Sequence, residues 1–463
     1  MLSRSAFGRN APRCLRKQCI AQSSPRRGMA AAANKGFEYE VGEAAGVKFA
    51  NREVAGRTTT LSLVAKAGSR YQPFPGYSDL LEKFAFKSTI KRSALRITRE
   101  SELLGGELSA SHSRENLVLT AKFLNNDLPY YAELLVEVIS GTKYSQHELD
   151  ELVLDLVKYS QKGLAANPTA QALDSAHNVA FHRGLGENLI PCAPSPFRKY
   201  VETEGIAAFA QGAYSKPSIA IVSSGPNTTD LSKWVGQLCR DIPTTSSSGP
   251  FSPKASEPSK YFGGEERIAS QVGNAIAIAF SGSSTIGSAN YKPEFAILAA
   301  LLGGQSTIKW SRGTSLLAKA TEAYSDVTVS TNNATYSDAG LLHITVSGKA
   351  QSVAAASKSI VETIEKVAAG NVSSEDIKKA SALAKFRSLE AADHATSFLE
   401  FTGSRLVHGG KPLQISDIGQ GIEKVAEQQV KAAAKSLLSG KASISAVGDL
   451  HVLPFAAEIG LTV

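Results

Sequence analysis

ENLVLTAKFL (residues 115–124) and AGLLHITVSG (residues 339–348) decide the architecture of this 463-residue chain. Both segments alternate apolar and polar residues with a period of two, which is typical of a half-buried β-strand. A helical pattern follows each of them, over residues 128–140 in the first case and 350–369 in the second. The same order of elements at two places indicates that the chain contains an internal repeat.

Two further matches keep nearly the same spacing. The two strands lie 224 residues apart (117 to 341), two capping boxes lie 228 apart (145 to 373), and two buried strands lie 224 apart (218 to 442). The capping boxes pair Ser145 with Glu148 and Ser373 with Asp376, and each predicts the start of a long helix. We therefore predict an α+β fold of two tandem homologous domains, each a mainly antiparallel sheet packed with helices.

The sequence TTSSSGPFSPKASEPSK (residues 244–260) marks the boundary between the two repeats. Ser and Pro dominate it and nothing periodic appears, so we interpret it as a solvated linker. It separates a predicted N-terminal domain, residues 37–243, from a predicted C-terminal domain, residues 261–463.

Residues 1–36 carry all of the net charge of +8, with eight Lys or Arg and no Asp or Glu. The remaining 42 basic residues balance the 42 acidic residues. An Arg-rich, acid-free segment rich in Ser and Ala is typical of a mitochondrial transit peptide, which is removed after import. A basic arm that binds nucleic acid is the alternative, but such arms carry denser Lys/Arg blocks. We expect no nucleic-acid partner.

The four cysteines and the apolar stretches exclude two classes of protein. Cys14 and Cys19 would leave with the transit peptide, and Cys192 and Cys239 are too far apart in sequence to indicate a disulfide scaffold. We predict that these two are buried thiols. The longest apolar stretch, residues 295–302, is far shorter than the ~20 residues that a membrane-spanning helix needs.

Common catalytic motifs are absent from the sequence. None of the eight histidines forms an H-x-x-x-H pair, and neither a G-x-S-x-G nor a P-loop motif occurs. Gly303–Gly304 follows an apolar helical stretch, where glycine ordinarily ends a helix. The acidic residues of the helix after Ser145 predict a solvated face; they are Glu148, Asp150, Glu151 and Asp155.

One region has a recognisable pattern: GYSDLLEKFAFKSTIKR (residues 76–92), followed by SELLGGELSASHSRENLVLTAKFL (residues 101–124). It resembles the pitrilysin-type inverted zinc peptidases, the family of the mitochondrial processing peptidase and the respiratory core proteins. Active members carry H-x-x-E-H in a helix before a signature that corresponds here to residues 86–89, Phe-Lys-Ser-Thr. The resemblance spans nearly the whole chain after residue 36, as two repeated domains.

The sequence departs from this family where the metal would bind. The H-x-x-E-H window falls on residues 79–83, with Asp79 and Lys83 in place of the two histidines and only Glu82 retained. The third ligand of the family aligns near Tyr159. A lysine ammonium repels a dication, and one carboxylate cannot hold zinc. We therefore expect no catalytic, metal-binding or cofactor-binding residues, with Glu82 and Lys83 in local ion pairs or interface contacts.

The resemblance, with these departures, implies a non-catalytic structural subunit of the ubiquinol–cytochrome c reductase complex. Such a subunit would lie peripherally on the matrix side of the mitochondrial inner membrane, with a homologous core subunit and the cytochrome and iron–sulfur subunits as partners. The alternative is the non-catalytic alpha subunit of the processing peptidase, which binds presequences. That subunit typically has an extended glycine-rich loop, whereas residues 302–305 here read Leu-Gly-Gly-Gln. An active metallopeptidase is the third and least favoured reading.

Overall fold

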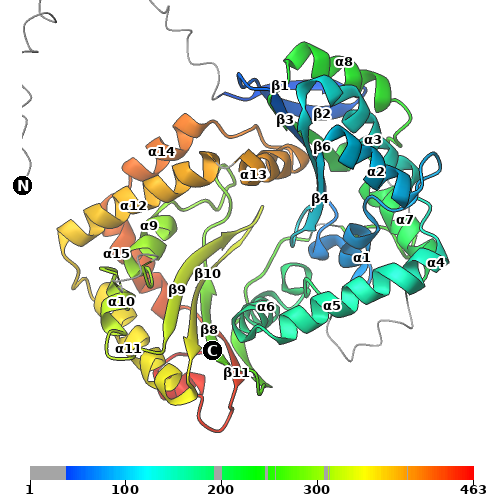
Figure 1. Ribbon diagram of the computed structural model, residues 1–463. Coiled ribbons are helices and arrows are strands. Elements are labelled where there is room, and N and C mark those ends of the chain that lie inside the picture. The colour runs from blue at the N-terminus through cyan, green and yellow to red at the C-terminus, as the bar shows by residue number, and fades with distance from the viewer. Residues whose placement is uncertain are drawn as a thin grey trace, which may run out of the picture. The chain divides into compact units, whose positions relative to one another are not determined.

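Two β-sheets, one in each half of the chain, organise the computed structural model in Figure 1. The described residues are 38–191, 201–245, 249–255, 257–306, 311, 313–393 and 395–463, without the side chains of 395–397, 416 and 420. The predicted transit peptide, Cys192 and parts of segments 244–260 and 309–317 lie outside these residues. Residues 37–463 form one compact unit.

The first sheet has six strands in the order β1-β2-β6-β3-β5-β4. The pair β2/β6 is parallel and every other pair is antiparallel. The strands are β1 Glu40–Ala44, β2 Val47–Arg52, β3 Thr58–Ala65, β4 Glu107–His112, β5 Leu117–Leu124 and β6 Ile219–Ser224. The helices of this half are α1 Tyr77–Phe84, α2 Ala94–Leu104, α3 Leu128–Gly141, α4 Gln146–Glu148, α5 Leu154–Ala165, α6 Pro168–Phe181, α7 Thr203–Ala213 and α8 Thr228–Leu238.

The second sheet has five strands in the order β7-β11-β8-β10-β9, again with one parallel pair, β7/β11. The strands are β7 Gly264–Ala269, β8 Asn274–Ser281, β9 Thr328–Thr335, β10 Gly340–Gly348 and β11 Ser443–Gly448. The helices are α9 Glu294–Leu302, α10 Leu316–Ala320, α11 Ala350–Ala368, α12 Ser374–Asp393, α13 Ala395–Val407, α14 Ile415–Glu423 and α15 Glu427–Ser439. The predicted pair of α+β repeats with mainly antiparallel sheets is confirmed.

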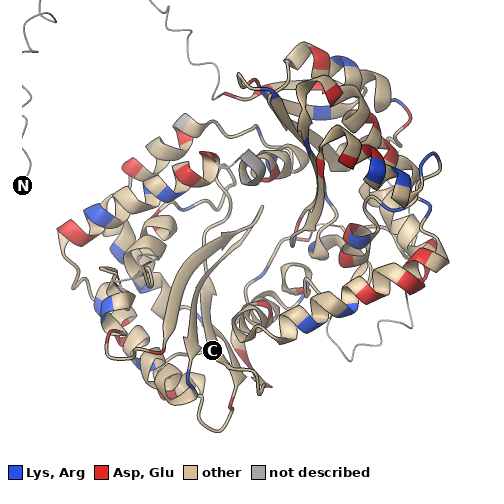
Figure 2. Cartoon of the chain, viewed as in Figure 1, with Lys and Arg blue, Asp and Glu red and all other residues tan. Residues whose placement is uncertain are grey.

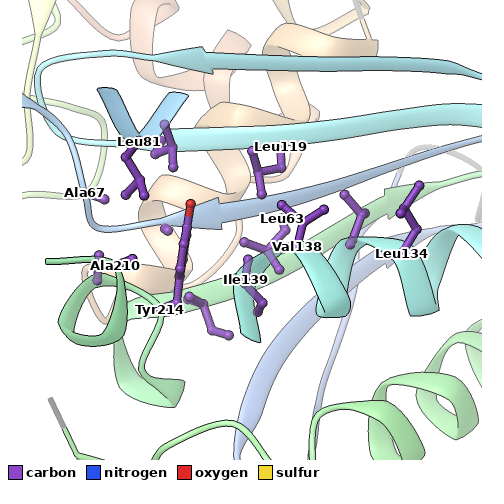
Figure 3. Packing of buried hydrophobic residues seen from close by; sticks show 14 of the residues in the cluster. Leu63, Ala67, Leu81, Leu119, Leu134, Val138, Ile139, Ala210 and Tyr214 are labelled. Carbon is purple, nitrogen blue, oxygen red and sulfur yellow. The ribbon is translucent and has the colours of Figure 1, made fainter. Parts of the chain in front are cut away.

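One face of each sheet packs against helices of its own half. In the first half, the core brings Leu63 of β3 and Leu119 of β5 together with Leu134 and Val138 of α3, as Figure 3 shows. These side chains are at most 2% exposed. Cys239 is a buried free thiol, as predicted, and burial raises its pKa to about 11.

The other face of each sheet is covered by a helix from the opposite half. Helix α6, which belongs to the first half, lays the buried side chains of Ala172, Ala176 and Ala180 against the second sheet. Because these alanines recur every four residues, they form one small-residue face that allows close approach to β8. Helix α13 of the second half packs in the same way on β2, β3 and β6 of the first sheet. The sequence analysis missed this exchange.

A buried ion network also joins the halves. The guanidinium of Arg70, on a residue 4% exposed, donates to Glu115 Oε1 at 2.8 Å and to both carboxylate oxygens of Asp338, at 2.8 and 2.7 Å. The Ser337 backbone N–H donates to Glu115 Oε2 at 2.9 Å. Burial opposes the charge of Asp338, but the bonds and charge of Arg70 outweigh it and lower the pKa of that carboxyl group.

The capping box predicted at Ser145 does not form as expected. The Ser145 hydroxyl donates to Glu148 at 2.9 Å and caps no backbone N–H, because Glu148 turns inward to accept from the Ser88 N–H at 3.1 Å. Glu148 is therefore 7% exposed, so the predicted solvated face is wrong for this residue. In the second half only the serine limb of the box forms: the Asp376 N–H donates to the Ser373 hydroxyl at 3.1 Å, and that hydroxyl donates to Asp376 Oδ2 at 2.8 Å.

Charged residues are frequent on several helices and absent from two strands of the second sheet, as Figure 2 shows. Helices α5 and α12 carry both signs of charge, whereas β9 and β10 carry none. The carboxylates of Asp150, Glu151 and Asp155 are exposed, as predicted. In the predicted linker, the half-buried ring of Phe251 stacks on Tyr77 with centroids 6.2 Å apart, so this residue contacts the first half of the chain.

Substitution of Gly403 in α13 tests how closely this helix packs on the first sheet. A Cβ atom at this position would lie 2.4 Å from Val64 Cγ2 on the first sheet. Alanine ordinarily gains about 1 kcal/mol over glycine inside a helix, but overpacking a core costs about 1–3 kcal/mol. The two effects combine to a net loss of about 0–2 kcal/mol, so we expect Gly403→Ala to lower the free energy of unfolding by up to about 2 kcal/mol in urea denaturation.

Gly163→Ala is the matched control, since this glycine of α5 is exposed and a Cβ would meet nothing within 4 Å. The control is expected to be neutral or stabilising. A Gly403→Ala variant that is as stable as Gly163→Ala would contradict the packing described for α13.

Candidate functional site

Helix α1 positions the window that corresponds to the family's metal-binding motif. It begins after Gly76, whose φ of 91° is readily adopted only without a Cβ. The Gln72 side chain accepts hydrogen bonds from the backbone N–H groups of Gly76, at 3.0 Å, and Ser78, at 3.4 Å. Leu80, Leu81 and Phe84 are buried in the core, which fixes the rotation of the helix about its axis.

Asp79, Glu82 and Lys83 lie together on one face of this helix, as their spacing in the window predicts. The Lys83 ammonium is 2.7 Å from Glu82 Oε1 and 3.6 Å from Asp79 Oδ1. The Asp79 carboxylate is 1% exposed, and neither of its oxygens has a hydrogen-bond partner within the described part of the chain. The expected local ion pairs of Glu82 and Lys83 are present in the structure.

A histidine that the sequence analysis did not single out completes the group. His112, the last residue of β4, places its backbone N–H 3.1 Å from Glu82 Oε2, and its ring Nδ1 bonds to the same oxygen. Its other ring nitrogen, Nε2, lies 2.9 Å from the backbone carbonyl oxygen of Leu189. With Glu82 ionised, as its lowered pKa favours, both partners accept, so both ring nitrogens donate and His112 is an imidazolium ion.

Asp79, Glu82, Lys83 and His112 are called the α1–β4 ion cluster below. Burial raises the pKa of Asp79 in spite of the charges of His112 and Lys83. For Glu82, burial would raise the pKa, but the bonds and charges of His112 and Lys83 outweigh it and lower it. For Lys83 and His112, burial would lower the pKa, but the carboxylates outweigh it and raise both values. Two acids and two bases thus compensate one another.

Tyr159, which aligns near the family's third ligand, does not join the cluster. It lies on α5 with 78% of its surface exposed. The three ligand-type atoms that do converge, from Asp79, Glu82 and His112, lie within 4.8 Å of one another. In the sequence, the glycines at 105–106 followed by alternating residues indicate that His112 lies on a strand. Only the fold shows that this strand ends beside α1.

Comparison with known proteins assigns the fold to a family. The family model described as insulinase (peptidase family M16) matches residues 49–191, and the one described as peptidase M16 inactive domain matches residues 201–383. A Neurospora crassa protein named cytochrome b-c1 complex subunit 2, mitochondrial, is 50% identical over 463 residues, which is 100% of both chains. The chain belongs to the M16 peptidase family. The resemblance seen in the sequence is thereby confirmed.

More distant M16 relatives carry the same name as the Neurospora protein. The Schizosaccharomyces pombe protein is 38% identical over 440 residues, covering 94% of this chain and 97% of the relative. The human protein is 28% identical over 422 residues, covering 89% and 90%. Both are named cytochrome b-c1 complex subunit 2, mitochondrial.

The raised pKa of His112 makes the stability of the cluster depend on pH. A group with a folded pKa above its unfolded value of about 6.5 stabilises fully below that value and less as the pH rises through the folded pKa. We expect His112→Ala to cost about 1–3 kcal/mol at pH 6, the usual loss for a hydrogen bond to a charged group. The cost should be smaller at pH 9, as measured by urea denaturation at both values.

His147→Ala is the control, because the His147 ring is 74% exposed and pairs with Glu151 at 3.2 Å on the surface of the helix. Such exposed pairs contribute about 0–1 kcal/mol. A cost of His112→Ala that grows with pH would contradict the imidazolium assignment.

Proposed function

We propose that the chain is core protein 2 of the mitochondrial ubiquinol–cytochrome c reductase, a structural subunit without catalytic activity. The observation that carries the proposal is full-length similarity, at 50% identity, to a protein with the printed name cytochrome b-c1 complex subunit 2. Its partners would be the homologous core protein 1 and the cytochrome and iron–sulfur subunits. We propose residues 1–36 as its transit peptide, and 37–243, 244–260 and 261–463 as its two domains and their linker.

The proposed location is the matrix side of the inner membrane, bound peripherally. Within the described residues, no helix combines the length and the apolar character needed to cross a membrane. Attachment would then depend on contacts with other subunits. The exchange of α6 and α13 supports a structural role, because it ties the two repeats into one unit with a fixed arrangement of surfaces.

The α1–β4 ion cluster supports the absence of peptidase chemistry. A zinc ion in a catalytic site needs three protein ligands and an open position for water. Here Lys83 holds a positive charge 2.7 Å from Glu82, and both ring nitrogens of His112 already donate to oxygen atoms. The residues present therefore do not fit a bound zinc ion, and no step of peptide hydrolysis can be assigned to them.

The alternative, the alpha subunit of the processing peptidase, is not favoured, because the two glycines after α9 do not belong to an extended glycine-rich loop. Gly303 and Gly304 end α9 and serve close packing, since a Cβ would lie 2.4 Å from Ser315 Cβ at the first position and 2.4 Å from the Val329 carbonyl oxygen at the second. The names of the relatives also favour the reductase subunit.

Native gel electrophoresis of gently solubilised mitochondria tests the proposed assembly. We expect the chain to migrate with the cytochrome-containing reductase complex, because a structural subunit is held by large permanent interfaces. An antibody against a cytochrome subunit provides the reference band. A soluble matrix species of about two subunits would contradict the proposal and favour the processing peptidase.

Metal analysis tests the proposed lack of catalytic activity. We expect the purified chain to contain well below one zinc ion per molecule, because the cluster neutralises its own carboxylates. A known zinc peptidase measured in the same way is the positive control. Stoichiometric zinc together with cleavage of a peptide would contradict the non-catalytic assignment.

A further inference from the structure

The Lys83 ammonium lies beside two of the three potential metal ligands, Glu82 and Asp79, and the third, His112, bonds to Glu82. The ammonium contacts Glu82 Oε1 at 2.7 Å and Asp79 Oδ1 at 3.6 Å, while His112 bonds to the second oxygen of Glu82. The side chain of Lys83 is 19% exposed, and that of Asp79 is 1% exposed. The positive charge at this point thus comes from the chain itself.

The surroundings of His112 are those of a metal-binding histidine. Such a histidine usually donates its distal ring N–H to a backbone carbonyl or carboxylate, which fixes the ring and directs the other nitrogen at the metal. Here Nε2 donates to the Leu189 carbonyl oxygen at 2.9 Å, and Nδ1 faces the carboxylates. The ring is therefore already oriented.

The Asp79 carboxylate is a second, independent sign of an incomplete site. It is buried, and neither oxygen accepts a hydrogen bond from any described residue. Buried carboxylates are ordinarily paired with hydrogen-bond donors or bound to a metal. The Lys83 ammonium at 3.6 Å and the charge of His112 compensate it in part.

The charges of the cluster add up to those of a metal site. The ammonium of Lys83 and the imidazolium of His112 together carry two positive charges against two carboxylates. A divalent ion bound to both carboxylates and to a neutral imidazole carries the same charge, and the imidazolium proton passes to solvent. Loss of the Lys83 side chain would leave the carboxylates short of one positive charge.

We propose that Lys83 supplies the cation of a latent metal site, and that removing its side chain opens a three-ligand site for a divalent transition metal at Asp79, Glu82 and His112. The three ligand atoms lie within 4.8 Å of one another. Metal–ligand bonds of about 2.0–2.2 Å bring such atoms to about 4 Å or less, so small side-chain movements suffice. One imidazole and two carboxylates suit zinc or cobalt(II).

This inference rests on the proposed metal-free cluster of the wild-type chain. The experiment is titration of the full-chain Lys83→Ala variant with zinc and with cobalt(II), whose visible absorption reports its coordination. We expect one equivalent to bind at least about tenfold more tightly than to the wild type, a difference of about 1.4 kcal/mol. The metal should also raise the thermal midpoint of the variant, because it binds only the folded state.

Two control variants define the site. Lys91→Ala removes a lysine from the loop after α1, where Lys91 is 68% exposed and pairs with Glu133 at 3.6 Å, and it should bind no more metal than the wild type. Lys83→Ala/His112→Ala should lose the added binding. Binding to the cysteines and histidines elsewhere in the chain is common to all variants and is subtracted.

The outcomes separate the two proposals. A folded Lys83→Ala variant without stoichiometric binding, or with binding that persists in the double variant, overturns the latent site. If Lys83→Ala does not fold alone, refolding with zinc decides: recovery of helical circular dichroism supports the site and its absence overturns it. Stoichiometric zinc in the wild type would instead overturn the metal-free cluster of the proposed function.

Discussion

The exchange of α6 and α13 is the constraint on which the rest of the structure depends. Each sheet packs one face against its own helices and leaves the other to a helix from the opposite half. Because a sheet face of small apolar side chains must be buried, neither half can satisfy its own packing. The buried charges of Arg70 and Glu115, with the half-buried Asp338, then help to fix the register between the halves, since an unpaired buried charge would be costly.

Compensation of buried charges also explains the α1–β4 ion cluster. The helix, the glycine before it and the strand that ends at His112 bring two acids and two bases together. In our proposal, the lysine at position 83 compensates the carboxylates as a dication would, but it offers no open coordination position and generates no hydroxide. The fold of the M16 peptidase family is retained around this ion cluster.

Local patterns predicted the strands and helices that match between the two repeats, because period-two alternation and apolar spacing are properties of short segments. The same short window also led us to expect Glu82 and Lys83, which are neighbours in sequence, in local ion pairs or interface contacts. Local patterns could not predict His112, which reaches Glu82 across 30 residues, or the contact of Glu148 with Ser88. The sequence could not predict the helix exchange either, because the alanine spacing of α6 does not show which sheet the helix contacts.

The exchange also has a consequence for how the chain is made. Synthesis proceeds from the N-terminus, so Ala50, Ala220 and Val222 emerge long before α13, which ends at Val407, exists to cover them. During that interval the first sheet presents an apolar face, a form prone to association with other chains. Covering the first sheet therefore requires α13, which lies in the last quarter of the chain, and a chaperone that shields this face would be most needed before α13 is available.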